Sequence, residues 1–268
     1  GQGLFGRLYS CVSVCAGSKG SDSSRSKSYR IWNRIKMTKP VLQEVALGFE
    51  GLQGQDLIAA AMDSFPDQLA LVSSFGTESA VLLHMAAEVD RDVPVIFLDT
   101  EKLFRPTRVY QERLSQHLRL TNVRQIRPSR LTLDEEDSSG ALWSTDPDRC
   151  CAIRKVQPLT EALKGFSAWV TGRKSFQNAD RDRAQTIESQ EGRLVLSPLL
   201  GWSKSQLTAY FEKHALPRHP LEQEGYLSVG CYTCTTAIAH GEDARAGRWR
   251  GRSKTECGIH KPHQKLTV

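Results

Sequence analysis

The sequence predicts an α/β protein built on a doubly wound, mostly parallel sheet. Short apolar runs of four or five residues alternate with longer segments in which apolar residues recur at helical spacing. Small polar residues directly follow several of the apolar runs. In a parallel sheet covered by helices, ligands bind beyond the carboxyl ends of the strands. The same alternation therefore also indicates where a binding site would lie.

The size and composition of the chain suit this fold class. Its 268 residues fit one such domain, or at most two small ones. Hydrophobic residues make up 39% and charged residues 25%, enough for a core and too balanced for a disordered chain. No apolar run reaches membrane-spanning length, so we expect no integral membrane protein.

The net charge of +6 is confined to one end of the chain. Residues 1–36 hold seven basic residues and one acidic residue, which leaves 29 of each sign in 37–268. The predicted domain is therefore neutral overall, which argues against a nucleic-acid partner. Residues 1–36 are Ser-rich and acid-poor, as transit peptides are. We favour a second interpretation, a disordered extension ahead of a start at Met37, in which Cys11 and Cys15 have no role.

The first predicted elements lie between residues 56 and 98. Residues 56–65 place Leu57, Ile58, Ala61 and Phe65 on one helical face. The apolar run 69–72 predicts a buried strand, and the apolar segment 80–87 predicts a helix. Residues 94–98 form a second apolar run and predict the next strand.

The alternation continues to residue 171 and then weakens. Residues 107–118 and 149–163 have helical spacing, whereas 123–126 and 168–171 read as strands. After about Pro217 the pattern is lost, and we expect the Gly-, Cys- and Arg-rich end to pack as an irregular appendage. Three loops that follow strands should meet at one crevice, namely 73–79, 99–100 and 172–174.

The loop 73–79 reads Ser-Ser-Phe-Gly-Thr-Glu-Ser and joins a predicted strand to a predicted helix. Its glycine permits close approach of the backbone, and hydroxyl and N–H groups at a helix N-terminus suit an anionic oxygen. It is not a Walker loop, because the Gly-Lys-Ser/Thr ending is missing. An ordinary Ser-rich turn with a helix cap remains the alternative.

Five cysteines lie outside residues 1–36. Cys150 and Cys151 are adjacent, and Cys231 and Cys234 form a C-x-x-C pair 80 positions later, while Cys257 stands alone. Two pairs of thiolates suit an iron–sulfur cluster or a structural zinc. The side chains of adjacent residues point in different directions, so both thiolates of Cys150 and Cys151 reach one small ion only with backbone strain. The irons of a [4Fe-4S] cluster lie at four separate corners, so neighbouring thiolates can bind different irons, which favours the cluster. Disulfides or unligated thiols remain the alternative.

The end of the chain combines positive charge with the lone cysteine. Five basic residues fall within ten positions, and Glu-Cys-Gly-Ile-His follows at 256–260. A cysteine beside cationic groups and a histidine is a candidate low-pKa nucleophile. A solvated basic tail with a spare thiol is the alternative. The basic residues are Arg245, Arg248, Arg250, Arg252 and Lys254.

Together these motifs resemble the assimilatory adenylylsulfate (APS) and phosphoadenylylsulfate (PAPS) reductase family, specifically its cluster-bearing branch. The resemblance covers about residues 68–260: the loop 73–79, Leu-Asp-Thr at 98–100, both cysteine pairs, Thr-Gly-Arg-Lys at 171–174 and the motif at 256–260. It implies an adenine-nucleotide alpha-hydrolase-like fold with a mobile C-terminal segment. Glu101-Lys102 departs from the family, where many members have Gly, and this could alter adenosine contacts.

The resemblance also implies a mechanism. Cys257 would attack the sulfur of APS, AMP would leave, and reduced thioredoxin from outside the chain would release sulfite from the S-sulfonate. Lys155 would reach the sulfate or the cluster edge, and His260 would favour the thiolate or contact the sulfate. The cluster would act structurally and electrostatically. The implied substrate contacts are Ser73, Ser74, Phe75, Gly76, Ser79, Leu98, Asp99, Thr100, Gly172, Arg173, Arg245 and Arg248.

Other functions remain open from the sequence. PAPS differs from APS by one 3′-phosphate, and some cluster-bearing relatives accept both. An ATP pyrophosphatase on the same fold would need a Ser-Gly-Gly-x-Asp-Ser loop, which 73–79 is not. An RNA-binding cluster or zinc protein would not need Cys257. We expect a reductase domain over residues 37–240 and a mobile tail over residues 241–268. We expect the protein to be cytoplasmic, or organellar if residues 1–36 are a transit peptide. Whether it forms a homo-oligomer remains open.

Overall fold

A six-stranded sheet forms the centre of the computed structural model, which describes residues 39–177 and 184–260. The strand order is β3-β2-β1-β4-β6-β5, and every neighbouring pair is parallel except β5 and β6. The doubly wound, mostly parallel fold is therefore confirmed. The strands are β1 Leu69–Ser73, β2 Val95–Leu98, β3 Val123–Ile126, β4 Ala168–Thr171, β5 Ile187–Gln190 and β6 Arg193–Leu196. The predictions for residues 1–36 and for 261–268 concern parts of the chain outside the described residues.

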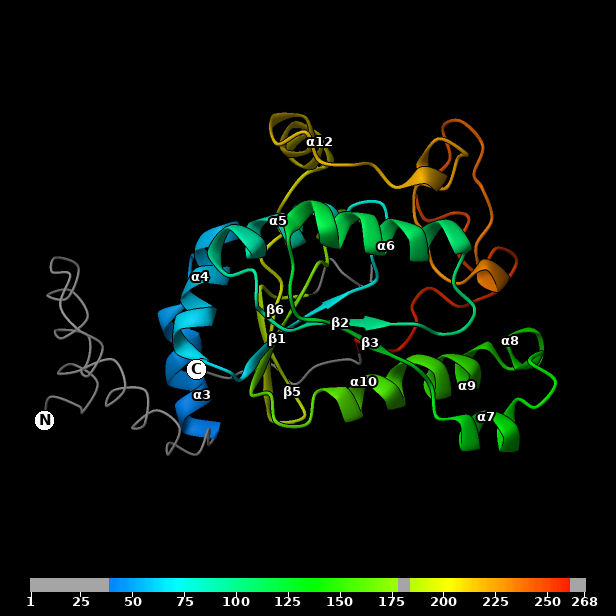
Figure 1. The fold of residues 1–268 in the computed structure, drawn as a ribbon, viewed down its shortest axis with the longest axis horizontal. Helices are drawn as coiled ribbons and strands as arrows, with labels where there is room; N and C mark the ends of the chain where they lie inside the picture. Colours follow the sequence, from blue (N-terminus) through cyan, green and yellow to red (C-terminus); the bar gives the residue numbers. More distant parts are fainter. Residues whose placement is uncertain (1–38, 178–183, 261–268) are drawn as a thin grey trace, which may run out of the picture. The chain divides into compact units, whose positions relative to one another are not determined.

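Helices cover both faces of the sheet. Helices α5 and α6 lie on one face, and α9 and α10 lie on the other (Figure 1). Strands β1 and β2 are buried along most of their length, as their continuous apolar runs predicted. The helices are α3 Lys39–Gly48, α4 Gly54–Ser64, α5 Ser79–Val89, α6 Arg105–Leu118, α7 Arg130–Glu136, α8 Leu142–Thr145, α9 Pro147–Cys151, α10 Gln157–Ala162 and α12 Lys204–Lys213. Within the described residues, none of them is long and apolar enough to cross a membrane.

The predicted helix 149–163 is present but is not uniform. A π-helical turn, Ala152–Val156, separates α9 from α10. Such turns shift the side chains that follow them and occur often at functional sites. This one contains Arg154 and Lys155, whose side chains are both buried.

Three elements between residues 184 and 217 are absent from the predictions. Strands β5 and β6 form a hairpin around Glu191 and Gly192, which both have positive φ, as two-residue hairpin turns require. Helix α12 begins with a capping box between Ser203 and Gln206. Each element is short, and charged or polar residues interrupt its periodicity.

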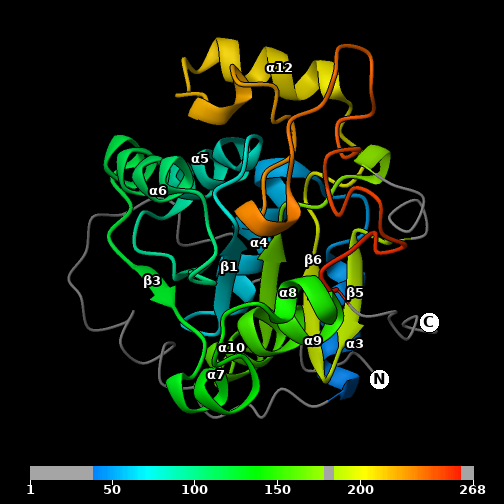
Figure 2. The same ribbon diagram turned by 90° about the vertical axis from the view of Figure 1, so that its right-hand side faces the viewer.

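The chain after α12 is irregular, as expected. It contains short 3₁₀ turns at Pro220–Glu222 and Tyr232–Cys234 and two isolated bridges. Figure 2 shows this segment, coloured orange to red, folded back over the end of the sheet at which the parallel strands terminate. The bridge between Leu103 and Cys231 joins it to the loop that follows β2.

Candidate active site

A cavity of about 380 Å³ opens at the carboxyl ends of the parallel strands. One side is formed by the loops after β1, β2 and β4, and the other by the irregular C-terminal segment. The three loops that the sequence predicted to converge therefore do meet. The predicted site residues that line the cavity are Ser73, Ser74, Gly76, Ser79, Leu98, Thr100, Lys155, Gly172, Arg173, Cys231, Arg245, Arg248, Cys257 and His260.

The loop after β1 presents small polar groups to the cavity and one aromatic ring to the core. The amide of Phe75 donates to Ser73 Oγ at 3.2 Å, and Phe75 has a positive φ of 49°. Its fully buried ring packs edge to face on Phe97, with ring centroids 5.2 Å apart. Phe75 therefore fixes the turn from the core side, and its side chain is not part of the cavity lining. Thr77 donates to the carbonyl of Leu227 at 2.8 Å and ties the loop to the C-terminal segment.

Asp99 is buried in the fold and is not among the cavity-lining residues. Its carboxylate accepts hydrogen bonds from Gln125 at 2.7 Å and from Arg127 at 3.2 Å. It also accepts from the amide of Glu101, which holds the turn after β2. The neighbouring Thr100 does line the cavity, and its hydroxyl lies 3.2 Å from Cys231 Sγ. Asp99 thus holds the turn after β2 in place, and Thr100 is the residue of this turn that contacts the cavity.

Lys155 is a buried cation of the site. It lines the cavity from the π-helical turn. Burial acts to lower its pKa, but the thiol groups of Cys231, Cys151 and Cys257 outweigh burial and raise it. Lys155 therefore carries a positive charge among three sulfur atoms. A buried, charged ammonium group is suited to binding an anionic substrate group.

Two arginines of the tail face the cavity from a single turn. The amide of Arg248 donates to the carbonyl of Arg245 at 2.8 Å, and both side chains line the cavity. Arg248 lies over the ring of Trp249 and donates to the carbonyl of Val229 at 3.4 Å. Arg245 forms an ion pair with Glu256 at 3.3 Å. In contrast, Arg250 pairs with Glu242 on the surface.

Arg173 has a structural role in addition to its place in the cavity wall. It is buried and forms an ion pair with Glu188 of β5, and it donates to Ser197 Oγ at 3.0 Å. The carboxylate balances much of its positive charge. Arg173 therefore joins β4 to the β5–β6 hairpin as well as lining the cavity. Its neighbour Lys174 is likewise paired, with Glu78 at 2.7 Å.

All five cysteines outside residues 1–36 are free thiols. Burial raises the pKa of Cys150 to about 11, and Cys151 and Cys231 contribute in the same direction. For Cys231, burial acts to raise the pKa, but Lys155 and the hydroxyl of Thr100 outweigh it and lower the value. Within the described residues, no group of three or more His, Cys, Asp or Glu side chains is gathered closely enough to hold a single metal ion.

Cys257 lies at the cavity beside Lys155, whereas His260 is held against the wall. The His260 ring stacks on Trp169 at 5.3 Å with an interplanar angle of 10°, and its Nε2 is 3.3 Å from Thr171 Oγ1. The expected contact of His260 with the thiolate or the sulfate therefore stays a prediction. The structure gives His260 a structural contact in addition.

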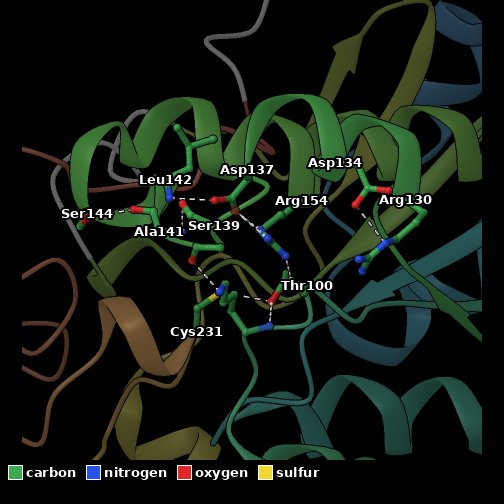
Figure 3. Close-up of polar contacts among 12 residues, drawn as sticks. Thr100, Arg130, Asp134, Asp137, Ser139, Ala141, Leu142, Ser144, Arg154 and Cys231 are labelled. Carbon is green, nitrogen blue, oxygen red and sulfur yellow. Dashed lines mark hydrogen bonds and ion pairs between the residues drawn. The ribbon is translucent and has the colours of Figure 1, made fainter.

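Sequence reasoning did not find the buried pair of Arg154 and Asp137. Arg154 donates to Asp137 Oδ2 at 3.1 and 2.6 Å and to the carbonyl of Thr100 at 2.9 Å (Figure 3). The amide of Leu142 donates to the other carboxylate oxygen. The pair joins the π-helical turn, the loop after α7 and the loop after β2. The signal in the sequence was an arginine beside Lys155, in a segment of the predicted helix that is otherwise apolar from Cys150 to Val156.

Comparison with known proteins shows the family of the chain. Residues 68–237 match the family model described as phosphoadenosine phosphosulfate reductase domain. A relative named adenosine 5'-phosphosulfate reductase, from Mesorhizobium japonicum, is 45% identical over 80% of this chain and 87% of its own. One named phosphoadenosine 5'-phosphosulfate reductase, from Gloeobacter violaceus, is 36% identical over 82% of this chain and 93% of its own.

Among solved structures, the phosphoadenylyl-sulfate (PAPS) reductase of Candida auris, in a phosphate complex, superposes with a TM-score of 0.63. It is 25% identical, and the match covers 75% of this chain and 99% of that one. The family match spans the strands β1 to β6 and both cysteine pairs, and the structural match extends over most of the same fold. The chain therefore belongs to the phosphoadenosine phosphosulfate reductase family.

Proposed function

We propose that this protein reduces adenylylsulfate to sulfite and AMP in sulfate assimilation. The observation that carries the proposal is the meeting of a free thiol, Cys257, with the cations of Lys155, Arg245 and Arg248 at the cavity that the loop 73–79 lines. Relatives named adenosine 5'-phosphosulfate reductase, at 34 to 45% identity over most of the chain, support the choice of substrate.

The first half-reaction transfers a sulfonate group to the protein. The Cys257 thiolate attacks the sulfur of APS, an S–S bond forms, and the bond between that sulfur and the phosphate oxygen breaks. The electron pair of the broken bond leaves with AMP. Arg245, Arg248 and Lys155 are the groups suited to balancing the charge on the leaving phosphate and the sulfate. Cys257 then carries the S-sulfonate.

The second half-reaction needs a dithiol from outside the chain, and we propose reduced thioredoxin. Its thiolate attacks Cys257 Sγ, sulfite leaves, and a mixed disulfide forms. The second thiol of the donor then attacks the mixed disulfide and restores the Cys257 thiol. Both electrons come from the dithiol, which becomes a disulfide.

We also propose that Cys150, Cys151, Cys231 and Cys234 hold a [4Fe-4S] cluster. Three of them are buried free thiols that influence one another's pKa, and Cys234 ends the 3₁₀ turn that begins next to Cys231. This set of soft thiolate donors fits a cluster with four separated corners better than one small ion. When bound, the cluster would supply a fixed charged support for Lys155, and the dithiol chemistry does not require it to change oxidation state.

The direct test measures sulfite release from APS and from PAPS, with reduced thioredoxin as the donor. We expect release from APS and much less from PAPS. Equal rates, or a preference for PAPS, would overturn the choice of substrate, and the names of the Gloeobacter and Candida proteins make PAPS the second candidate. No release from either compound would overturn the proposed function.

A further inference from the structure

The residue two positions beyond Cys257 is packed into the body of the protein. The side chain of Ile259 lies against a buried core cluster that includes Leu159, Leu163 and Trp169. Its carbonyl accepts a hydrogen bond from Gln190 Nε2, on the edge strand β5, at 3.3 Å. One apolar and one polar contact therefore hold this part of the tail.

The next residue adds a stacked contact. The ring of His260 lies nearly parallel to Trp169, and its Nε2 is close to the hydroxyl of Thr171. Trp169 is 2% exposed, with Ile259 and His260 both packed against it. Gly258 joins Cys257 to this contact with a φ of +81°, a conformation that glycine adopts without strain.

The contacts on the other side of Cys257 are polar, and the nearest is the ion pair of Glu256 with Arg245, whose side chains are 21% and 13% exposed. Arg252 donates to the carbonyls of Trp143 and Ser144 at 3.1 and 3.3 Å. Lys254, whose side chain is 8% exposed, forms an ion pair with Asp148, whose side chain is 81% exposed. Ion pairs in contact with solvent contribute little to stability, whereas buried apolar contacts contribute more. The apolar contact of Ile259 should therefore add substantially to the polar contacts before Cys257 in holding the thiol at the cavity.

We propose that Trp169 and Gln190 are positioning residues for the nucleophile. They form an anchor, defined here as the surface that holds Ile259 and His260, and this anchor keeps Cys257 at the cavity for the first half-reaction. Release of the anchor frees the tail so that the S-sulfonate can reach a donor protein. The inference rests on the proposed function for its purpose, but the anchor itself can be tested without substrate.

The test uses Ile259→Ala and Gln190→Ala in the full chain, isolated anaerobically. Resting protein is treated with iodoacetamide, and the peptide that contains Cys257 is followed by mass. We expect Cys257 to be alkylated roughly tenfold faster in Ile259→Ala, equivalent to about 1.4 kcal/mol in the opening equilibrium. Ile259→Leu should restore the slow rate. Leu131→Ala, which removes an exposed apolar side chain from α7, is the matched control and should not change it.

The two half-reactions separate positioning from general damage. With APS and no reductant, Ile259→Ala should form the Cys257 S-sulfonate several-fold more slowly than wild type. Once formed, the S-sulfonate should release sulfite to reduced thioredoxin at least as fast as in wild type. Gln190→Ala should also form the S-sulfonate more slowly and release sulfite without slowing, with a smaller change in rate. If Ile259→Ala does not fold, the Gln190→Ala variant alone tests the anchor.

Two results would overturn the anchor. One is alkylation of Cys257 at the wild-type rate in folded Ile259→Ala or Gln190→Ala protein. The other is equal slowing of both half-reactions. Wild-type protein that forms no S-sulfonate, combined with faster alkylation in the variants, would refute the proposed function and leave the anchor intact. The reverse combination would refute the anchor alone.

Discussion

Replacing Asp137 by alanine isolates the buried ion pair beneath the site. The Asp137 side chain is 0% exposed, and that of its partner Arg154 is 5% exposed. The substitution removes both carboxylate contacts and leaves a guanidinium group buried without its counter-charge. Breaking a buried pair in this way costs about 3–5 kcal/mol. We expect the free energy of unfolding to fall by that amount.

The matched control lies one turn away on α7. Arg130 and Asp134 also form an ion pair, at 3.2 Å, but their side chains are 79% and 60% exposed (Figure 3). Exposed pairs at this helical spacing contribute only about 0.3–0.5 kcal/mol. Asp134→Ala should therefore be nearly neutral. The contrast between the two aspartates tests burial, because both pair with an arginine.

The assay is urea unfolding of the holoprotein under anaerobic conditions, followed by circular dichroism and by tryptophan fluorescence. Coincident transitions are needed before free energies are compared. The double variant Asp137→Leu with Arg154→Met should cost less than Asp137→Ala alone, since apolar replacement of a whole buried pair is often neutral. A loss below about 1 kcal/mol in Asp137→Ala would refute the reasoning.

The same carboxylate predicts a pH dependence. Burial acts to raise the pKa of Asp137, but the amide of Leu142 and the guanidinium of Arg154 outweigh it and lower the value. A depressed pKa stabilises the fold above the unfolded-state pKa, and that contribution is lost as the pH falls through the folded-state value. The Asp137-dependent stability should therefore be complete at neutral pH, begin to fall near pH 4, and be lost progressively as the pH drops through the lower folded-state pKa. Asp137→Asn should lack this acid-dependent step.

Three further predictions concern the site. Cys257→Ser should fold and bind APS but form no covalent intermediate. Wild-type protein incubated with APS and no reductant should gain the mass of one SO₃ group on the peptide that contains Cys257. Finding that mass on another residue would contradict the mechanism. Arg245→Ala and Arg248→Ala should each lower kcat/KM by roughly tenfold, since hydrogen bonds to charged groups contribute about 1.5 kcal/mol or more, and Arg250→Ala should change it little. Anaerobically purified protein should contain about four iron atoms per chain. Replacing any one of the four predicted cysteine ligands by serine should lower the iron content and the thermal stability together. Stoichiometric zinc without iron would contradict the proposed cluster.

Four of the six strands of the sheet, and most of the residue types of the site, were predictable from the sequence alone. Strands β1, β2 and β4 were predictable because buried parallel strands are continuous apolar runs, and the helices between them show the helical period. The edge strand β3 has apolar residues only at its two ends, Val123 and Ile126. The loop 73–79, Lys155 and Cys257 were found through their motifs. Those motifs consist of residues near one another in the chain, so they can be read without knowing the fold.

The folded structure sets the partner of each of these groups. It matches Arg173 with Glu188, directs Asp99 to Gln125 and Arg127, and stacks His260 on Trp169. Each contact joins segments that are 15 to 91 positions apart in sequence. A charge or a ring in a sequence has no partner until the strands are placed beside one another, because local propensity carries no information about long-range neighbours. The residue types therefore indicated which chemistry the site could support. The packing of the sheet, the hairpin and the tail decides which side chains line the cavity and which are paired with other parts of the fold.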